Sequence, residues 1–211
     1  MIIQKLFNDQ VLLATSMRKD GNMRAFSETE FDEVLKNQNT IVTALGGRSD
    51  NTARVLTTYF ERKSFTEYCE INDRTITEHA INKPETALKL ADGLVTRTRD
   101  YTLLLPLADC LGVVFFDPEQ NVLGLLHSGR QNLEEDGAYK YVEFLQLQAP
   151  KPESLSYSSC SEFRNIRPKS CQARRGSQRA AATRRDQIRE YWSLRHRYSR
   201  QSWLPFKLNR R

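Results

Sequence analysis

The chain has 211 residues, of which 39% are hydrophobic and 27% charged, a composition typical of one soluble domain with a substantial core. No segment approaches the ~18–20 consecutive apolar residues of a membrane span, and the first residues lack a signal-peptide pattern, so we expect a cytoplasmic protein without membrane contact. Four widely spaced cysteines with no CxxC pair exclude a disulfide framework.

The formal net charge of +6 is distributed unevenly along the chain. Residues 151–211 contain 16 of the 32 Lys and Arg but only 4 of the 26 Asp and Glu, which makes this segment strongly basic and leaves the preceding residues acidic. The two parts therefore follow different compositional rules, and the basic charge does not describe the domain as a whole.

The first predicted elements are a strand followed by helices. An apolar run at residues 11–14 indicates the strand, and Ser27-Glu28-Thr29-Glu30 fits a capping box, so a helix should begin near Glu28. The Gly46-Gly47 pair should end this helix, and we interpret residues 51–63 as a second one.

Residues 102–129 form the most informative segment, because two apolar runs flank a turn at residues 117–121 and predict a buried β-hairpin. The runs are continuous rather than alternating, so both faces of these strands should be covered. Residues 134–148 supply one covering helix, with an acidic first turn and apolar side chains at helical spacing. We therefore predict an α+β fold of layered mixed β-sheets covered by helices.

After Pro152 the composition changes abruptly. Aliphatic residues become sparse, serines cluster, and arginine accounts for 13 of the 16 basic residues in 151–211, so this segment can bury little apolar surface to offset its ordering entropy. Two explanations remain open: a genuine basic tail, or the out-of-frame reading of a gene whose proper ending would complete the domain. We expect an incomplete catalytic core at residues 1–155 and a disordered or frame-shifted tail at residues 156–211, which does not complete the fold.

Cys110 and His127 are the residues of the hairpin that carry chemistry. Counting from the turn places them at matching depths on the two strands, so we expect cross-strand neighbours about 5 Å apart. A thiolate and an imidazole at that spacing can form a nucleophile and base pair or chelate zinc. The spacing alone leaves these alternatives open, together with plain packing.

Three ordered strings in the same region carry a family resemblance: ADGLVT at 91–96, PLADC at 106–110 and VLGLLHSG at 122–129. They resemble the core signature of the laccase-domain family, whose members are also described as polyphenol-oxidase-like, peptidoglycan-editing-factor or purine nucleoside phosphorylase proteins. That signature runs from an Asp-Ala-Leu-Val-Thr-like segment through Thr-Ala-Asp-Cys to His-Ala-Gly-Trp-Arg-Gly. The resemblance implies a laccase-domain-like fold over residues 1 to about 150.

The resemblance also implies a third ligand and two supporting acids. His79 matches the position of the family's ligand in a Gln-Val-His-Gly segment, so His79, Cys110 and His127 are the expected metal ligands. Asp92 and Asp109 match acids that could orient a ligand or bind substrate. The structural alternatives are that His79 is a solvent-exposed histidine and that Asp92 and Asp109 are carboxylates that cap turns.

Three such ligands would leave a fourth position open, which is the arrangement of catalytic zinc, so Zn²⁺ is the expected cofactor. The resemblance implies a purine nucleoside and phosphate as partners, with phosphorolysis of adenosine, inosine or methylthioadenosine and deamination of adenosine. The expected catalytic residues are Cys110, His127, Asp109 and Arg130. Arg130 lies one position away from the family's arginine, and nothing after residue 156 matches the family, so we expect impaired activity.

Three other functions fit parts of the sequence. A basic nucleic-acid-binding protein could use the Arg-rich tail with its interleaved aromatic residues, but no nucleic-acid fold accompanies it, so we do not expect this partner. A metal-free hydrolase could use Cys110 and His127 as nucleophile and base. A copper oxidase fits less well, because it needs many His ligands and the chain has 3 His.

Overall fold

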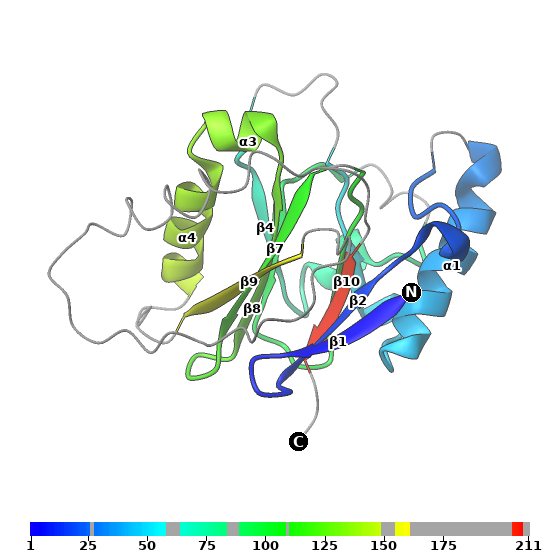
Figure 1. Ribbon diagram of the computed structural model, residues 1–211, viewed down its shortest axis with the longest axis horizontal. Coiled ribbons are helices and arrows are strands. Elements are labelled where there is room, and N and C mark those ends of the chain that lie inside the picture. The colour runs from blue at the N-terminus through cyan, green and yellow to red at the C-terminus, as the bar shows by residue number, and fades with distance from the viewer. Residues whose placement is uncertain are drawn as a thin grey trace, which may run out of the picture.

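The computed structural model describes residues 1–25, 28–57, 64–83, 89–108, 110–148, 155–160 and 204–208. In this part of the chain the strands form two five-stranded sheets (Figure 1). The first sheet has the order β1 (Ile2–Leu6), β2 (Val11–Thr15), β10 (Leu204–Leu208), β6 (Thr102–Leu105) and β3 (Thr52–Arg54). The second sheet has the order β4 (Tyr68–Ile71), β5 (Gly93–Thr96), β8 (Val122–Ser128), β7 (Leu111–Asp117) and β9 (Ser156–Cys160).

In the described residues, four α-helices and three 3-10 turns accompany the sheets. The helices are α1 (Phe31–Ala44), α2 (Ile76–His79), α3 (Arg130–Glu134) and α4 (Gly137–Gln148). The 3-10 turns are η1 (Arg18–Asp20), η2 (Glu28–Glu30) and η3 (Ser49–Asn51). In Figure 1, α4 lies beyond the second sheet and α1 lies at the opposite side, beyond the first sheet. The predicted α+β fold of layered sheets covered by helices is therefore confirmed.

The main core lies between the two sheets. It combines fully buried side chains from both of them: Val11, Leu13, Ala53, Leu103 and Leu105 from the first sheet, and Ile71, Leu94, Leu123 and Leu125 from the second. At ~25 cal/mol per Å² of apolar surface removed from water, this layer is the main stabilising contribution to the fold. The same core packs the two sheets against each other.

The outer face of the second sheet packs against α4 around Tyr141. This side chain is fully buried, and its hydroxyl group donates a hydrogen bond to the carbonyl oxygen of Leu94. Gly93 and Gly124 make room for the ring, because a Cβ atom at either position would come within 2.7 Å of a Tyr141 atom. The continuous apolar runs of β7 and β8 are thus covered on both faces, as their sequence predicts.

The predicted hairpin is confirmed over Leu111–Asp117 and Val122–Ser128. The carboxylate of Asp117 accepts hydrogen bonds from the backbone N–H groups of Glu119 and Gln120, each at 2.9 Å, which stabilises the turn. The apolar run at Thr102–Leu105 is not part of the hairpin, however. It forms β6 in the other sheet, because the chain bends between the two runs.

The helix predicted for residues 51–63 is wrong where the structure describes it. Thr52–Arg54 forms β3, which pairs in parallel with β6, and residues 58–63 lie outside the described part. Pairing with a strand distant in sequence outweighs the local helical pattern here. The covering helix predicted for residues 134–148 is confirmed as α4, but its acidic first turn falls at the junction with α3, where Asp136 has a φ of +58°.

Beyond Pro152 the sequence indicates no strand, whereas the structure has β9 at an edge of the second sheet and β10 between β2 and β6. Backbone hydrogen bonding to a neighbouring strand explains these short segments better than their own side-chain pattern does. The rest of the predicted tail lies outside the described residues, and its prediction stays a prediction. No described helix has the length and apolar character that crossing a membrane requires.

Candidate functional site

The candidate site lies where the two sheets approach each other, at a place that we call the corner. The backbone N–H of Leu56, just after β3, donates to Lys89 at 2.8 Å, and that of Ala91, just before β5, donates to Leu56 at 3.2 Å. The hydroxyl group of Thr57 donates to the carbonyl oxygen of Pro106, after β6, at 3.2 Å. The corner therefore joins the end of β3, the end of β6 and the start of β5.

His127 and Asp92 form a buried pair at the corner. The backbone N–H of His127 donates to the carbonyl oxygen of Asp92 at 2.7 Å, and the imidazole Nδ1 lies 3.5 Å from the carboxylate Oδ1. His127 is 2% exposed and Asp92 fully buried, so water does not compete for this contact. A carboxylate on Nδ1 favours the tautomer in which Nε2 carries the lone pair, and this tautomer serves both a metal ligand and a proton-transfer group.

Cys110 carries a half-buried thiol just before β7. The strand register pairs Gly112 with His127 and Leu111 with Ser128, so the predicted direct pairing of Cys110 with His127 is wrong. The tight turn pairs Asp117 with Val122, which offsets Cys110 from His127 by two positions. Cys110 itself precedes Leu111, the first paired residue of β7.

His79 is the last residue of α2 and is buried. Burial lowers the pKa of its imidazole, although a hydrogen bond with the backbone of Arg54 opposes this effect. Its Nδ1 is buried and has no hydrogen-bond partner. A neutral imidazole with an unsatisfied nitrogen is chemically suited to a metal ion.

The described residues nevertheless contain no group of three His, Cys, Asp or Glu side chains that could hold a metal ion. The structure thus brings Asp92 to His127, but the described residues do not gather His79, Cys110 and His127 into a ligand set. The donor types fit zinc, whereas their described arrangement does not.

The two remaining predicted site residues are Arg130 and Asp109. Arg130 is the first residue of α3, where its side chain is exposed two positions beyond the end of β8. Asp109 lies outside the described residues.

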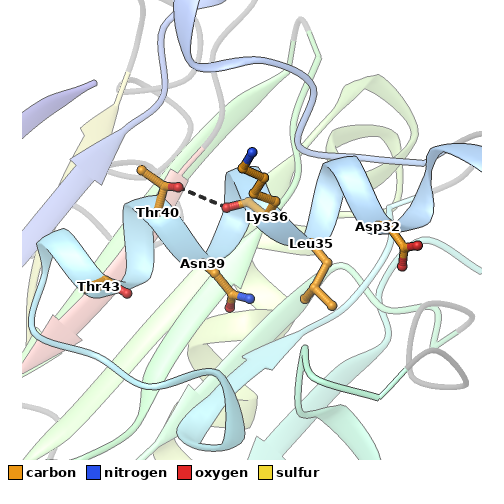
Figure 2. A pocket seen from close by; sticks show the side chains of 6 residues that line it. All are labelled: Asp32, Leu35, Lys36, Asn39, Thr40 and Thr43. Atoms are coloured by element: carbon orange, nitrogen blue, oxygen red, sulfur yellow. Dashed lines mark hydrogen bonds between the residues drawn. The ribbon is translucent and has the colours of Figure 1, made fainter.

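Figure 2 shows a pocket along α1, which includes none of the predicted site residues. It is lined by Asp32, Leu35, Lys36, Asn39, Thr40 and Thr43. The Thr40 hydroxyl donates to the carbonyl oxygen of Lys36 at 2.9 Å, which is ordinary helix chemistry. Arg54, at the end of β3, is a buried cation, and no periodic signal in its segment indicates its burial.

The class of the protein is α+β: two layered β-sheets are covered by helices, and a buried Asp92–His127 pair lies where the sheets meet. Within that class, residues 15–158 match the family model described as multi-copper polyphenol oxidoreductase laccase. This match covers more than half of the chain, so the chain belongs to that family.

Similar proteins are known from bacilli. A 71-residue segment is 41% identical to purine nucleoside phosphorylase YlmD of Bacillus subtilis (strain 168), covering 33% of this chain and 26% of that relative. The crystal structure of the Bacillus licheniformis hypothetical protein YfiH matches with a TM-score of 0.61 at 20% identity, over 72% of this chain and 58% of the other. That of YlmD from Geobacillus stearothermophilus matches with a TM-score of 0.59 at 19% identity, over 71% and 56%. The two structures support the fold, and this chain spans little more than half of their length.

Proposed function

We propose that this chain is a purine nucleoside phosphorylase whose active site is the corner. In this reaction a phosphate oxygen bonds to C1′ of the ribose while the bond from C1′ to the purine breaks, and the purine nitrogen takes up a proton. We propose adenosine, inosine and methylthioadenosine as substrates, with deamination of adenosine as a second activity. The observation that carries the proposal is the buried Asp92–His127 pair, two register positions from Cys110, within the segment that matches the family.

Each residue at the corner has a proposed role. Asp92 positions the imidazole of His127, whose Nε2 then faces the reacting groups together with the thiol of Cys110. Arg130 is exposed at the first turn of α3 and would contact the substrate phosphate from the rim of the site. Asp109, which precedes Cys110 in the sequence, is proposed to bind the nucleoside.

We further propose zinc as the cofactor, with His79, Cys110 and His127 as the residues that would hold it. Zinc supplies a bound water of lowered pKa, which is the chemistry that deamination of adenosine requires. Binding of zinc would require His79 to approach the other two residues. Copper, which the family description names, is the alternative metal.

The first prediction is that Cys110→Ala and His127→Ala each lower phosphate-dependent release of the base from inosine by at least ~100-fold, because each removes a group at the reacting centre. Base release and ammonia release from adenosine are measured by chromatography. Cys69→Ala is the matched control, since Cys69 is another half-buried cysteine, on β4, where it pairs with Leu94. Equal losses in Cys69→Ala and Cys110→Ala would remove Cys110 from the site.

A metal-free hydrolase with Cys110 as nucleophile is the second candidate, and the Asp92–His127 contact favours it because a carboxylate also orients a catalytic base. Metal analysis separates the two. Activity that survives complete removal of metal by a chelator would support the hydrolase, whereas loss of activity with restoration by zinc would support the zinc enzyme.

A further inference from the structure

Two polar side chains, one in α3 and one just after it, hold the segment that leads into β4. Helix α3 follows β8 directly and lies at one end of the second sheet (Figure 1). The amide of Asn132 is buried, and its Nδ2 donates to the carbonyl oxygen of Phe65 at 2.6 Å. The carboxylate of Glu135 accepts hydrogen bonds from the backbone N–H of Phe65 at 3.1 Å and from the hydroxyl group of Ser64 at 3.3 Å. We call Asn132 and Glu135 the clamp.

The clamped segment also holds the carboxylate of Asp92. The backbone N–H of Glu67 donates to Oδ2 of Asp92 at 3.4 Å, and the backbone N–H of Asp92 donates to the carbonyl oxygen of Glu67 at 2.7 Å. The other carboxylate oxygen, Oδ1, lies 3.5 Å from Nδ1 of His127. A displacement of residue 67 would therefore turn the carboxylate and change its contact with the imidazole.

These contacts form a closed circuit. The chain runs from His127 into the clamp, and the clamp holds both polar groups of the Phe65 backbone. Glu67 follows two residues later and contacts Asp92, which returns to His127. Gly137 provides the room for the clamp, because a Cβ atom there would overlap the amide of Asn132. Contacts of this kind fix the orientation of a functional side chain from behind.

The attachment of β4 to α4 does not depend on the clamp. The hydroxyl group of Tyr68 donates to the carbonyl oxygen of Gly137 at 2.7 Å. The Tyr68 ring packs against those of Tyr141 and Phe144, with ring centres 4.9 and 5.5 Å apart. These contacts already hold the start of β4 against α4. What the clamp adds is a fixed position for residues 64–67, next to the buried carboxylate.

We propose that Asn132 and Glu135 are positioning residues that keep the carboxylate of Asp92 on Nδ1 of His127. This inference rests on the proposed function, in which His127 acts at the reacting centre. The clamp acts through residues 64–67 and not by contact with substrate. A carboxylate on Nδ1 keeps the proton there and leaves the lone pair on Nε2. Loosening the clamp should therefore populate the other tautomer, in which Nε2 carries the proton.

The test reads the tautomer of His127 by long-range ¹H–¹⁵N NMR of the full chain. Spectra are recorded at about pH 8, where an ordinary histidine is neutral, and with a chelator, so that no metal fixes the tautomer. The chain has 3 His, and His127→Ala identifies the signals of this one. We expect the proton on Nδ1 in the parent chain. Asn132→Ala and Glu135→Ala should each move a measurable share of it to Nε2.

Two further variants separate positioning from general effects. Glu135→Gln keeps an oxygen that accepts from the N–H of Phe65, so it should have the tautomer of the parent chain. Glu134→Ala is the matched control, because Glu134 is an exposed glutamate at the preceding position. Glu135 is only half-buried, so Glu135→Ala should fold and decides the test if Asn132→Ala does not.

Steady-state kinetics with inosine and phosphate give a second reading. Asn132→Ala and Glu135→Ala should lower kcat by about 10-fold, because the imidazole is misoriented in the reacting complex. Both KM values should change little, since the groups that contact the substrates are intact. Glu135→Gln and Glu134→Ala should keep the kcat of the parent chain.

Four results would overturn the inference: a proton on Nε2 of His127 in the parent chain, the parent's tautomer in folded clamp variants, an equal shift in Glu134→Ala, or an unfolded Glu135→Ala. Failure of the proposed function gives a different result. A tautomer shift in the clamp variants, without phosphorolysis by the parent chain, supports the clamp and contradicts the proposed function alone. Phosphorolysis by the parent chain, with an unchanged tautomer in the folded clamp variants, contradicts the clamp alone.

Discussion

The two helix-covered faces of the molecule differ in what lies beneath the helix. Under α4, the second sheet presents apolar side chains, and the hydroxyl group of Tyr141 is hydrogen-bonded to Leu94. Under α1, Val42 and Leu104 pack together, but the buried Thr102 Oγ1 and two nitrogens of Arg54 have no partner. Folding stability alone explains the apolar face under α4. The face under α1 keeps polar groups that cost stability, and it therefore indicates function.

The largest effect should come from the apolar face. Replacing Tyr141 by Ala removes a fully buried ring that contacts Tyr68, Phe115 and Phe144, so we expect a loss of about 4 kcal/mol in the free energy of unfolding. Urea unfolding measures this quantity. A loss below about 1 kcal/mol would show that the α4 face does not hold the second sheet as described.

A smaller effect should follow from filling the space beside the same ring. A Cβ atom at Gly124 would lie 2.7 Å from the hydroxyl oxygen of Tyr141 and 3.2 Å from Leu145 Cδ2, so Gly124→Ala should destabilise by about 1–3 kcal/mol. In a Tyr141→Phe background the hydroxyl is gone and the same substitution should cost less. Equal costs in the two backgrounds, measured by urea unfolding, would contradict this contact.

The smallest effect concerns pH and the polar side of the molecule. Burial lowers the pKa of His79 in the folded state, so the unfolded chain binds the proton first as pH falls below the ordinary His value of about 6.5. The contribution of His79 to stability is therefore present above that pH and is lost progressively as pH falls through the folded-state pKa. His79→Gln should unfold with a weaker pH dependence over this window, and an unchanged dependence would show that His79 is not buried as a neutral group.

The difference between the two faces also explains what could be predicted from sequence. The hairpin could be predicted, because its continuous apolar runs and the Asp117 turn are local signals in the sequence. Strand β3 could not, because Thr52–Arg54 has no alternation and its pairing with β6 is distant in sequence. Helical spacing therefore gave a wrong interpretation of that segment.

The candidate site was predictable to a similar extent. The chemistry-bearing residues Cys110 and His127 stand out by motif, and the carboxylate of Asp92 was expected to orient a ligand. The two-residue offset between Cys110 and His127 depends on how the turn closes, which the motif does not specify. The burial of Arg54 under α1 could not be predicted, because a single arginine in a mixed segment gives no signal of burial.

The most direct measurement of the central claim is the identity of the sugar product formed from inosine. The full chain is incubated with inosine and phosphate, and ³¹P NMR follows the reaction, with His127→Ala as the inactive reference. We predict a ribose 1-phosphate signal that grows in step with hypoxanthine and is absent from the reference. Hypoxanthine released with free ribose would contradict phosphorolysis and favour the hydrolase, and no release at all would contradict a nucleoside-cleaving function for the corner.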